Sequence, residues 1–136
     1  MKGLVLWLLM ALPASSAFAD ATVGQSAVQE VITQQFEAFR QDDFSRAFDF
    51  ASPVIKGLFQ TPENFGQMVR QGYPMVWRHS GAVFLDFQDI GGRMVQTVEV
   101  TDPAGQRFLL GYEMVQTEAG WRINGVALLK AKDVGV

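Results

Sequence analysis

Three polar side chains fall among apolar residues in the second half of the chain. Tyr112, Gln96 and Asn124 each lie in a stretch where apolar residues alternate with other types. A tyrosine hydroxyl can donate a hydrogen bond to a ligand, and the two amides can both donate and accept. An apolar surface with few polar groups is typical of small-molecule pockets. These are the candidate ligand-binding residues, with packing of the tyrosine in the core as the alternative.

The sequence offers little for catalysis. It has no cysteine and one histidine, His79, which excludes cysteine nucleophiles, thiolate metal sites and multi-histidine zinc or iron sites. The acids Asp42 and Asp43 lack the spread of ligands of a calcium loop, and we interpret them as a helix cap. Gly91-Gly92 is interpreted as a hairpin turn rather than a phosphate loop. We therefore expect no catalytic residue, no metal ligand and no cofactor.

Composition and net charge limit the kinds of molecule that this chain is expected to bind. The chain has 136 residues, 49% of them apolar and 18% charged, with a formal net charge of -3. This composition is typical of a globular protein, and the length fits one domain. An acidic chain lacks the basic footprint of a nucleic-acid-binding protein. Arg70, Arg78 and Arg93 could line a pocket mouth and hold an anionic ligand through paired hydrogen bonds, or be solvated surface charges.

The first nineteen residues have the layout of a secretory signal peptide. Lys2 provides a positive start, residues 4–12 are apolar, and Ala17-Phe18-Ala19 has the small-x-small pattern of a cleavage site. The apolar run is shorter than the ~20 residues that a membrane span needs. We expect residues 1–19 to be cleaved, no membrane span in the mature chain, residues 20–136 to form one domain, and a periplasmic location, with secretion as the alternative.

Helical spacing dominates the residues that follow. A frayed lead-in at residues 20–25 and a cap at Ser26 are predicted to precede one amphipathic helix. Ser52-Pro53 and Thr61-Pro62 each combine a capping hydroxyl with a proline, which favours a helix start. The apolar positions of the first helix are Val28, Val31, Ile32, Phe36 and Phe39.

After Pro74 the apolar period changes from helical to two. Four strands are predicted at residues 82–88, 93–101, 107–117 and 121–129, joined by glycine-containing turns. Residues 75–79 are a candidate for a further short strand. Helices followed by an antiparallel meander indicate an α+β fold with the helices packed on one face of the sheet.

The turn types set a register for these strands. The predicted pairs are Ile90–Arg93, Asp102–Gln106 and Thr117–Trp121. One face is then nearly all apolar, and we expect the helices to cover it. Its residues are Val83, Leu85, Phe87, Met94, Gln96, Val98, Val100, Phe108, Leu110, Tyr112, Met114, Arg122, Asn124, Val126 and Leu128.

The opposite, outer face mixes carboxylates with large apolar side chains. Its apolar part is larger than a monomer comfortably leaves in water. We therefore expect a homodimer through the outer face, or its cover by residues 130–136. The predicted outer residues are Phe84, Asp86, Thr97, Glu99, Leu109, Glu113, Val115, Trp121, Ile123 and Leu129.

Several motifs resemble a known family. They are Phe50-Ala51-Ser52-Pro53, Thr61-Pro62-Glu63-Asn64-Phe65, Met68-Val69-Arg70-Gln71-Gly72-Tyr73-Pro74 and Gly120-Trp121-Arg122-Ile123. In this order they resemble a bacterial exported family catalogued as domain-of-unknown-function family 4864. The overall layout resembles the nuclear transport factor 2-like, or cystatin-like cone, superfamily. That resemblance implies helices on the concave face of a curled antiparallel sheet, with a pocket between them, and it implies no activity.

Three functions remain open. The first is a non-catalytic binding module that holds a small hydrophobic or amphipathic molecule in the cone. The second is an isomerase- or dehydratase-type enzyme using Tyr112 with Asp89 or His79, although the expected inner face lacks a clear carboxylate base. The third is a protein-interaction domain acting through the outer face. Both pocket hypotheses weaken, and the protein-interaction hypothesis gains support, if the interior is filled by Phe36, Phe48, Phe65, Phe87 and Phe108.

Overall fold

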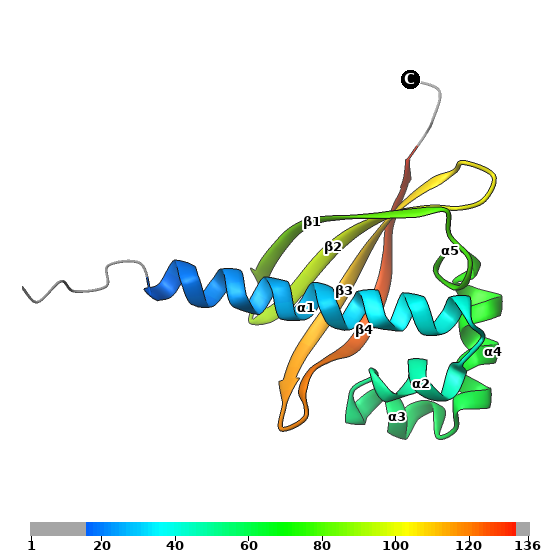
Figure 1. Ribbon diagram of the computed structural model, residues 1–136, viewed down its shortest axis with the longest axis horizontal. Helices are drawn as coiled ribbons and strands as arrows, with labels where there is room; N and C mark the ends of the chain where they lie inside the picture. Colours follow the sequence, from blue (N-terminus) through cyan, green and yellow to red (C-terminus); the bar gives the residue numbers. More distant parts are fainter. Residues whose placement is uncertain (1–15, 133–136) are drawn as a thin grey trace, which may run out of the picture.

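The computed structural model describes residues 16–132, and the side chains of residues 24–129. Helices come first and an antiparallel sheet follows, which confirms the predicted α+β layout (Figure 1). The helices are α1 (Ser16–Arg40), α2 (Phe44–Asp49), α3 (Pro53–Phe59), α4 (Pro62–Gly72) and α5 (Pro74–Trp77). The strands are β1 (Gly81–Ile90), β2 (Arg93–Thr101), β3 (Arg107–Thr117) and β4 (Gly120–Lys132). They form an open four-stranded meander in the order β1-β2-β3-β4.

The short helices begin at the predicted caps. The Asp43, Ser52 and Thr61 side chains each accept a hydrogen bond from a backbone N–H three residues on. Pro53 and Pro62 occupy the first helical turns of α3 and α4. These starts are local, because a capping oxygen and a preset φ angle act within one turn.

Two predictions about the helical half of the chain are wrong. Helix α1 begins at Ser16, so residues 20–25 are helical rather than a frayed lead-in, and Ser26 lies inside the helix. Alanine has the highest helix propensity, so the alanines at positions 17, 19 and 21 favour a helix that begins upstream of the predicted cap. The candidate strand at residues 75–79 overlaps α5, whose first position is Pro74. Of the expected signal peptide, residues 1–15 lie outside the described residues.

Two of the three predicted turn registers are confirmed. Ile90 pairs with Arg93, and the Asp102 N–H donates to the Gln106 carbonyl at 2.8 Å. The third is wrong by one residue, because Thr117 pairs with Gly120. Gly120 has a φ of 106°, which allows this tighter turn.

A bulge in β4 changes which side chains face the helices. The register shifts between Glu113 and Met114, so Tyr112 pairs with Val126 as predicted while Met114 pairs with Ile123. Ile123 is buried. The Trp121 ring packs against Phe87 and the core, beside Gly24 of α1, and so lies on the helix side of the sheet. The predicted faces of residues 121–124 are therefore wrong, because one extra residue reverses the alternation.

A second bulge, in β1, also changes which side chains face the helices. The register shifts between Phe84 and Phe87, and Phe84 pairs with Val98. Phe84 packs against the core, whereas Val83 and Leu85 are exposed. The prediction that Val83 and Leu85 face the helices is wrong for this reason.

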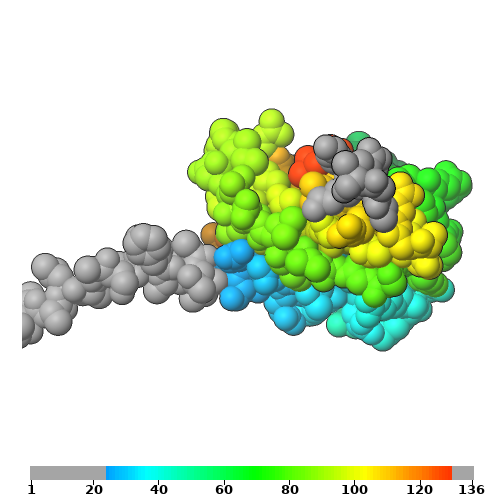
Figure 2. All heavy atoms as spheres, turned by 90° about the horizontal axis from the view of Figure 1, so that it is seen from above, coloured from blue at the N-terminus to red at the C-terminus, as the bar shows by residue number. Residues whose placement is uncertain are grey.

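The space between the helices and the sheet is filled by side chains. Phe36, Phe48 and Phe65 are buried there, and Phe87 and Phe108 pack against the same cluster. The Phe48 and Phe65 ring centroids lie 5.2 Å apart. Seen from above, α1 in blue to cyan runs along one side of this body (Figure 2). Within the described residues, no helix combines the length and the apolar character that crossing a membrane requires.

Candidate functional site

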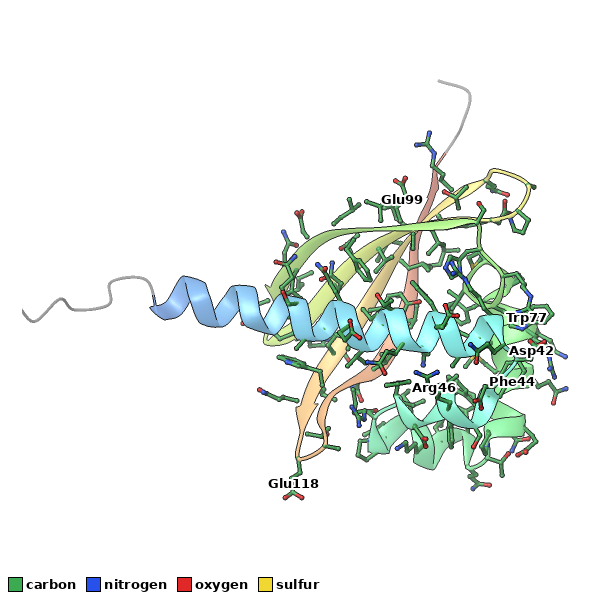
Figure 3. The ribbon with its side chains drawn as sticks, viewed as in Figure 1. Asp42, Phe44, Arg46, Trp77, Glu99 and Glu118 are labelled. Atoms are coloured by element: carbon green, nitrogen blue, oxygen red, sulfur yellow. The ribbon has the colours of Figure 1, made fainter. Side chains whose placement is uncertain are left out.

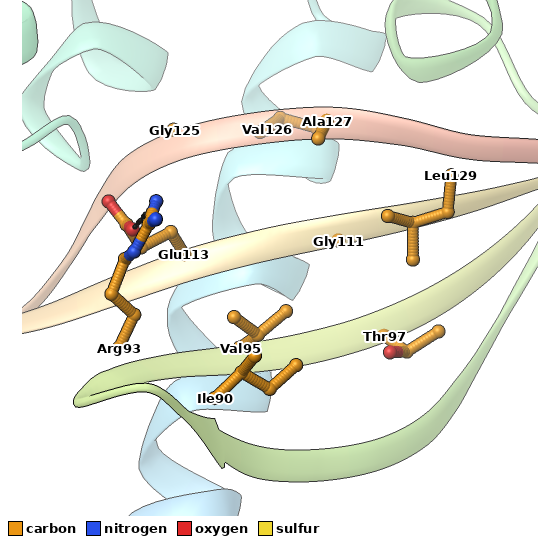
Figure 4. A pocket seen from close by; sticks show the side chains of 10 residues that line it. All are labelled: Ile90, Arg93, Val95, Thr97, Gly111, Glu113, Gly125, Val126, Ala127 and Leu129. Atoms are coloured by element: carbon orange, nitrogen blue, oxygen red, sulfur yellow. Dashed lines mark hydrogen bonds and ion pairs between the residues drawn. The ribbon is translucent and has the colours of Figure 1, made fainter.

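An apolar hollow lies on the outer face of the sheet. Its volume is about 460 Å³, within the range of small-molecule sites. Helix α1 passes behind the sheet in this view, so the hollow is on the face away from it (Figure 4). Its apolar side chains are Ile90, Val95, Val126, Ala127 and Leu129.

Two glycines form the floor of the hollow. Gly111 in β3 pairs with Ala127 in β4, and Gly125 lies two residues before Ala127. A Cβ at Gly111 would lie 3.4 Å from carbons of Leu129 and Val95, in van der Waals contact with both side chains. Glycine inside a strand commonly marks such a close approach. The missing side chains leave a trough across β3 and β4.

The trough has one charged end. The Arg93 Nη1 donates to the Glu113 Oε1 at 3.3 Å. The Arg93 side chain is 76% exposed and the Glu113 side chain is 23% exposed. An exposed pair of this kind stabilises the fold by only about 0–1 kcal/mol. The pair therefore contributes little to the stability of the fold, and it places a positive and a negative charge at one end of the trough.

Asn124 holds the buried side of this ion pair. Its Nδ2 donates to Glu113 Oε2 at 2.6 Å, and its Oδ1 accepts from Ser52 Oγ at 2.7 Å. The Ser52 Oγ also accepts from the Ile55 N–H at the start of α3. The chain Arg93–Glu113–Asn124–Ser52 thus connects the end of the hollow to helix α3. Of the three predicted ligand-binding residues, Asn124 is the one that lines a surface hollow. That hollow, of about 500 Å³, is a separate and more polar one that shares Arg93 and Glu113 with the first.

Tyr112 and Gln96 lie together, but in the core. They are cross-strand neighbours in β2 and β3, and both are fully buried. Gln96 Nε2 donates to the carbonyls of Leu85, Asp86 and Thr97. The bonds to Leu85 and Asp86 stabilise the bulge in β1. The Tyr112 hydroxyl and Gln96 Oε1 have no hydrogen-bond partner among the described residues. Burial, with a smaller effect of the Tyr73 hydroxyl, raises the pKa of Tyr112 far above its usual range.

The other candidate acid–base residues lie in structural contacts. Asp89 accepts from the Gly92 N–H in the hairpin turn. The His79 ring packs 4.6 Å from Phe36, and its Nε2 lies 3.2 Å from Arg40 Nη2. Burial lowers the pKa of His79. The hydrogen bond with the Val76 carbonyl opposes this in part, and the charge of Arg40 has a smaller effect that lowers the pKa further.

Asp42 is held at the end of α1 rather than in a metal site. It accepts hydrogen bonds from Trp77 Nε1 and from Arg78 Nη2, each at 2.8 Å. Figure 3 shows Asp42 and Trp77 next to each other. The Trp77 bond, followed by the Arg78 bond and charge, lowers the pKa of Asp42 below its usual value. Among the described residues, no group of three or more histidine, aspartate or glutamate side chains could hold a metal ion.

A second apolar groove lies between α3, α4 and β4. Its volume is about 210 Å³, and it shares Gly125 and Val126 with the outer hollow. Leu58 and Met68 are among its apolar residues, and Tyr73 lies at its side with its hydroxyl donating to the Val126 carbonyl. The outer hollow is the stronger candidate for an apolar ligand, because it is larger than this groove and its lining is more apolar than that of the hollow beside Asn124.

Sequence reasoning missed the centre of the hollow. It placed Glu113 on the outer face and named Arg93 as an anion-binding candidate, but gave no role to Gly111 or Gly125. The available signal was a glycine in the middle of each of two predicted strands. Such glycines mark a close backbone approach or a bulge.

One comparison with known proteins identifies the family. The sequence profile described as "Domain of unknown function (DUF4864)" matches residues 21–136. The chain belongs to this family. No curated protein and no solved structure matches the chain. Membership confirms the family resemblance, while the likeness to the cystatin-like cone stays a prediction.

Proposed function

We propose that this DUF4864 domain is a non-catalytic binding module for a small hydrophobic or amphipathic molecule. The binding site is the outer hollow rather than the interior of the cone. The observation that carries the proposal is the trough over Gly111 and Gly125, whose walls include Leu129 and Ile90. These two side chains are 54% and 55% exposed, so a bound apolar molecule would remove both from water.

The filled interior supports this choice of site. Phe36, Phe48 and Phe65 occupy the space in which the cone hypothesis places a ligand. The described residues also bring no carboxylate beside Tyr112 that could act as its catalytic base. An isomerase-type reaction therefore has weaker support than binding.

Dimerisation through the outer face is part of the proposal. A second copy packed on this face would cover Ile90 and Leu129 and close the hollow from above. We place this assembly in the periplasm after removal of residues 1–19, with secretion as the alternative. Sedimentation and native mass spectrometry of the exported protein test the dimer and any retained molecule together.

A matched pair of variants tests the site. Ala127→Trp puts a large ring into the hollow, because Ala127 is exposed and lines it. Ala104→Trp adds the same ring at an exposed position in the turn between β2 and β3. Both are titrated with the neutral apolar dye N-phenylnaphthylamine. The wild type and Ala104→Trp should bind the dye and Ala127→Trp should not, whereas equal binding by both variants would exclude the outer hollow as the site.

A further inference from the structure

Building on the proposed function, we infer that the ligand is an amphipathic molecule with a single carboxylate. Its carboxylate binds the Arg93 guanidinium at the charged end of the hollow. Its alkyl chain lies along the trough over Gly111 towards Leu129. Binding of an apolar molecule depends on the trough, whereas selection of a carboxylate depends on Arg93, so the two properties can fail independently.

The first argument is the hydrogen-bonding capacity at the charged end. A guanidinium carries five N–H donors, and among the described residues the Arg93 side chain has one partner, Glu113. Both Glu113 oxygens already accept a hydrogen bond, one from Arg93 and the other from Asn124. The groups still free to bind a ligand are therefore the remaining N–H donors of the exposed Arg93. A carboxylate can accept two such hydrogen bonds in parallel.

The second argument is charge. Arg93 and Glu113 together are neutral, so the site accepts a singly charged anion more easily than a doubly charged phosphate beside the same carboxylate. A cationic head group would instead have to approach the more exposed member of the pair, which is the arginine. A neutral alcohol has one oxygen, so one of the two parallel N–H donors of Arg93 would remain bonded to water.

The third argument is the shape of the apolar part. From Gly125 to Leu129 the trough follows four residue steps of β4, or about 13 Å. Along this length the lining is apolar except for Thr97. A medium-length, unbranched alkyl chain matches a narrow trough whose floor is two glycines. Each methylene that fits should raise affinity about fourfold until the trough is full.

Matched ligands and matched arginines provide the test. Dodecanoate and dodecanol, below their aggregation limits, are titrated against the mature protein by displacement of N-phenylnaphthylamine. Arg93→Gln removes the charge in the hollow. Arg107→Gln removes a similar charge on the same sheet, where Arg107 lies 3.8 Å from Glu99 and outside the hollow.

The wild type and Arg107→Gln should bind dodecanoate about tenfold or more tightly than dodecanol, as expected for a charge-assisted hydrogen bond. Arg93→Gln should bring that ratio close to one while still binding dodecanol. Equal affinity of the wild type for both ligands, or an unchanged ratio in Arg93→Gln, would overturn the carboxylate inference and leave the hollow as an apolar site. Failure of the wild type to bind the dye or either ligand would overturn the proposed function as well.

Discussion

The Ser52 hydroxyl both caps helix α3 and hydrogen-bonds to Asn124 in β4. The stability that Ser52→Ala should lose can therefore be calculated from these two bonds. The Oγ accepts from the Ile55 N–H at 3.2 Å and donates to Asn124 Oδ1 at 2.7 Å. Ser52 is 1% exposed, so water cannot readily replace these bonds. Loss of a helix cap costs about 1 kcal/mol, and a partly buried acceptor left without its donor costs about 1 kcal/mol more. The free energy of unfolding should fall by about 2 kcal/mol.

Thermal unfolding followed by circular dichroism measures this change. For a domain of this length about 1 kcal/mol corresponds to about 4 °C in Tm, so Ser52→Ala should lower Tm by about 8 °C. Thr61→Ala is the matched control, because the Thr61 Oγ1 caps α4 through the Asn64 N–H and is exposed. It should lose only the cap, or about 4 °C.

The difference between the two variants tests the connection to Asn124. A loss in Ser52→Ala no larger than that in Thr61→Ala would refute the reasoning. A double-mutant cycle of Ser52→Ala with Asn124→Ala should also give a coupling free energy of about 1 kcal/mol, as expected for side chains in direct contact. A coupling near zero would mean that the hydrogen bond between them does not stabilise the fold.

Three further predictions concern other elements. Gly66→Ala should lower the free energy of unfolding by about 1–3 kcal/mol, because its Cβ would lie 2.7 Å from the Phe44 ring. Gly57→Ala, whose Cβ would meet no described atom within 4 Å, should raise it by about 0.5–1 kcal/mol; urea denaturation of both variants checks the contrast. Tyr112→Phe removes a buried hydroxyl that has no described partner, so Tm should stay the same or rise, and a drop of several degrees would count against this. The folded-state pKa of His79 lies below 6.5, so the unfolded chain binds the proton more readily and stability should decline as the pH falls below 6.5. His79→Gln should flatten Tm between about pH 8 and 5, and an unchanged slope would exclude His79 as the cause.

Local interactions were predictable from the sequence. The caps at Asp43, Ser52 and Thr61 and the turn pairing Ile90 with Arg93 appear in the structure as expected. Each depends on residues within three or four positions of one another, so the residue types alone determine them. The start of α1 was missed because helix propensity extends a helix past any single capping residue.

The side chains that face each side of the sheet were decided by tertiary structure. In β4 the bulge beside Asn124 buries Ile123 and turns Trp121 towards the helices, reversing the predicted alternation. The bulge is accompanied by pairing of the segment around Ala51 with Ile123, and the partners lie 72 residues apart. No local pattern in either segment encodes that contact.

The candidate site shows the same division. The alternation of residue types predicted that Glu113 faces outward, and the resemblance to DUF4864 was visible in short motifs. The hollow lies where Gly111 and Gly125 come together from neighbouring strands, and Ser52, in the helical half, holds Asn124 beside Glu113 at its charged end. Sequence spacing determines the period of a strand, whereas a cavity depends on which side chains are absent from several strands at once, and that is settled only when the strands pair.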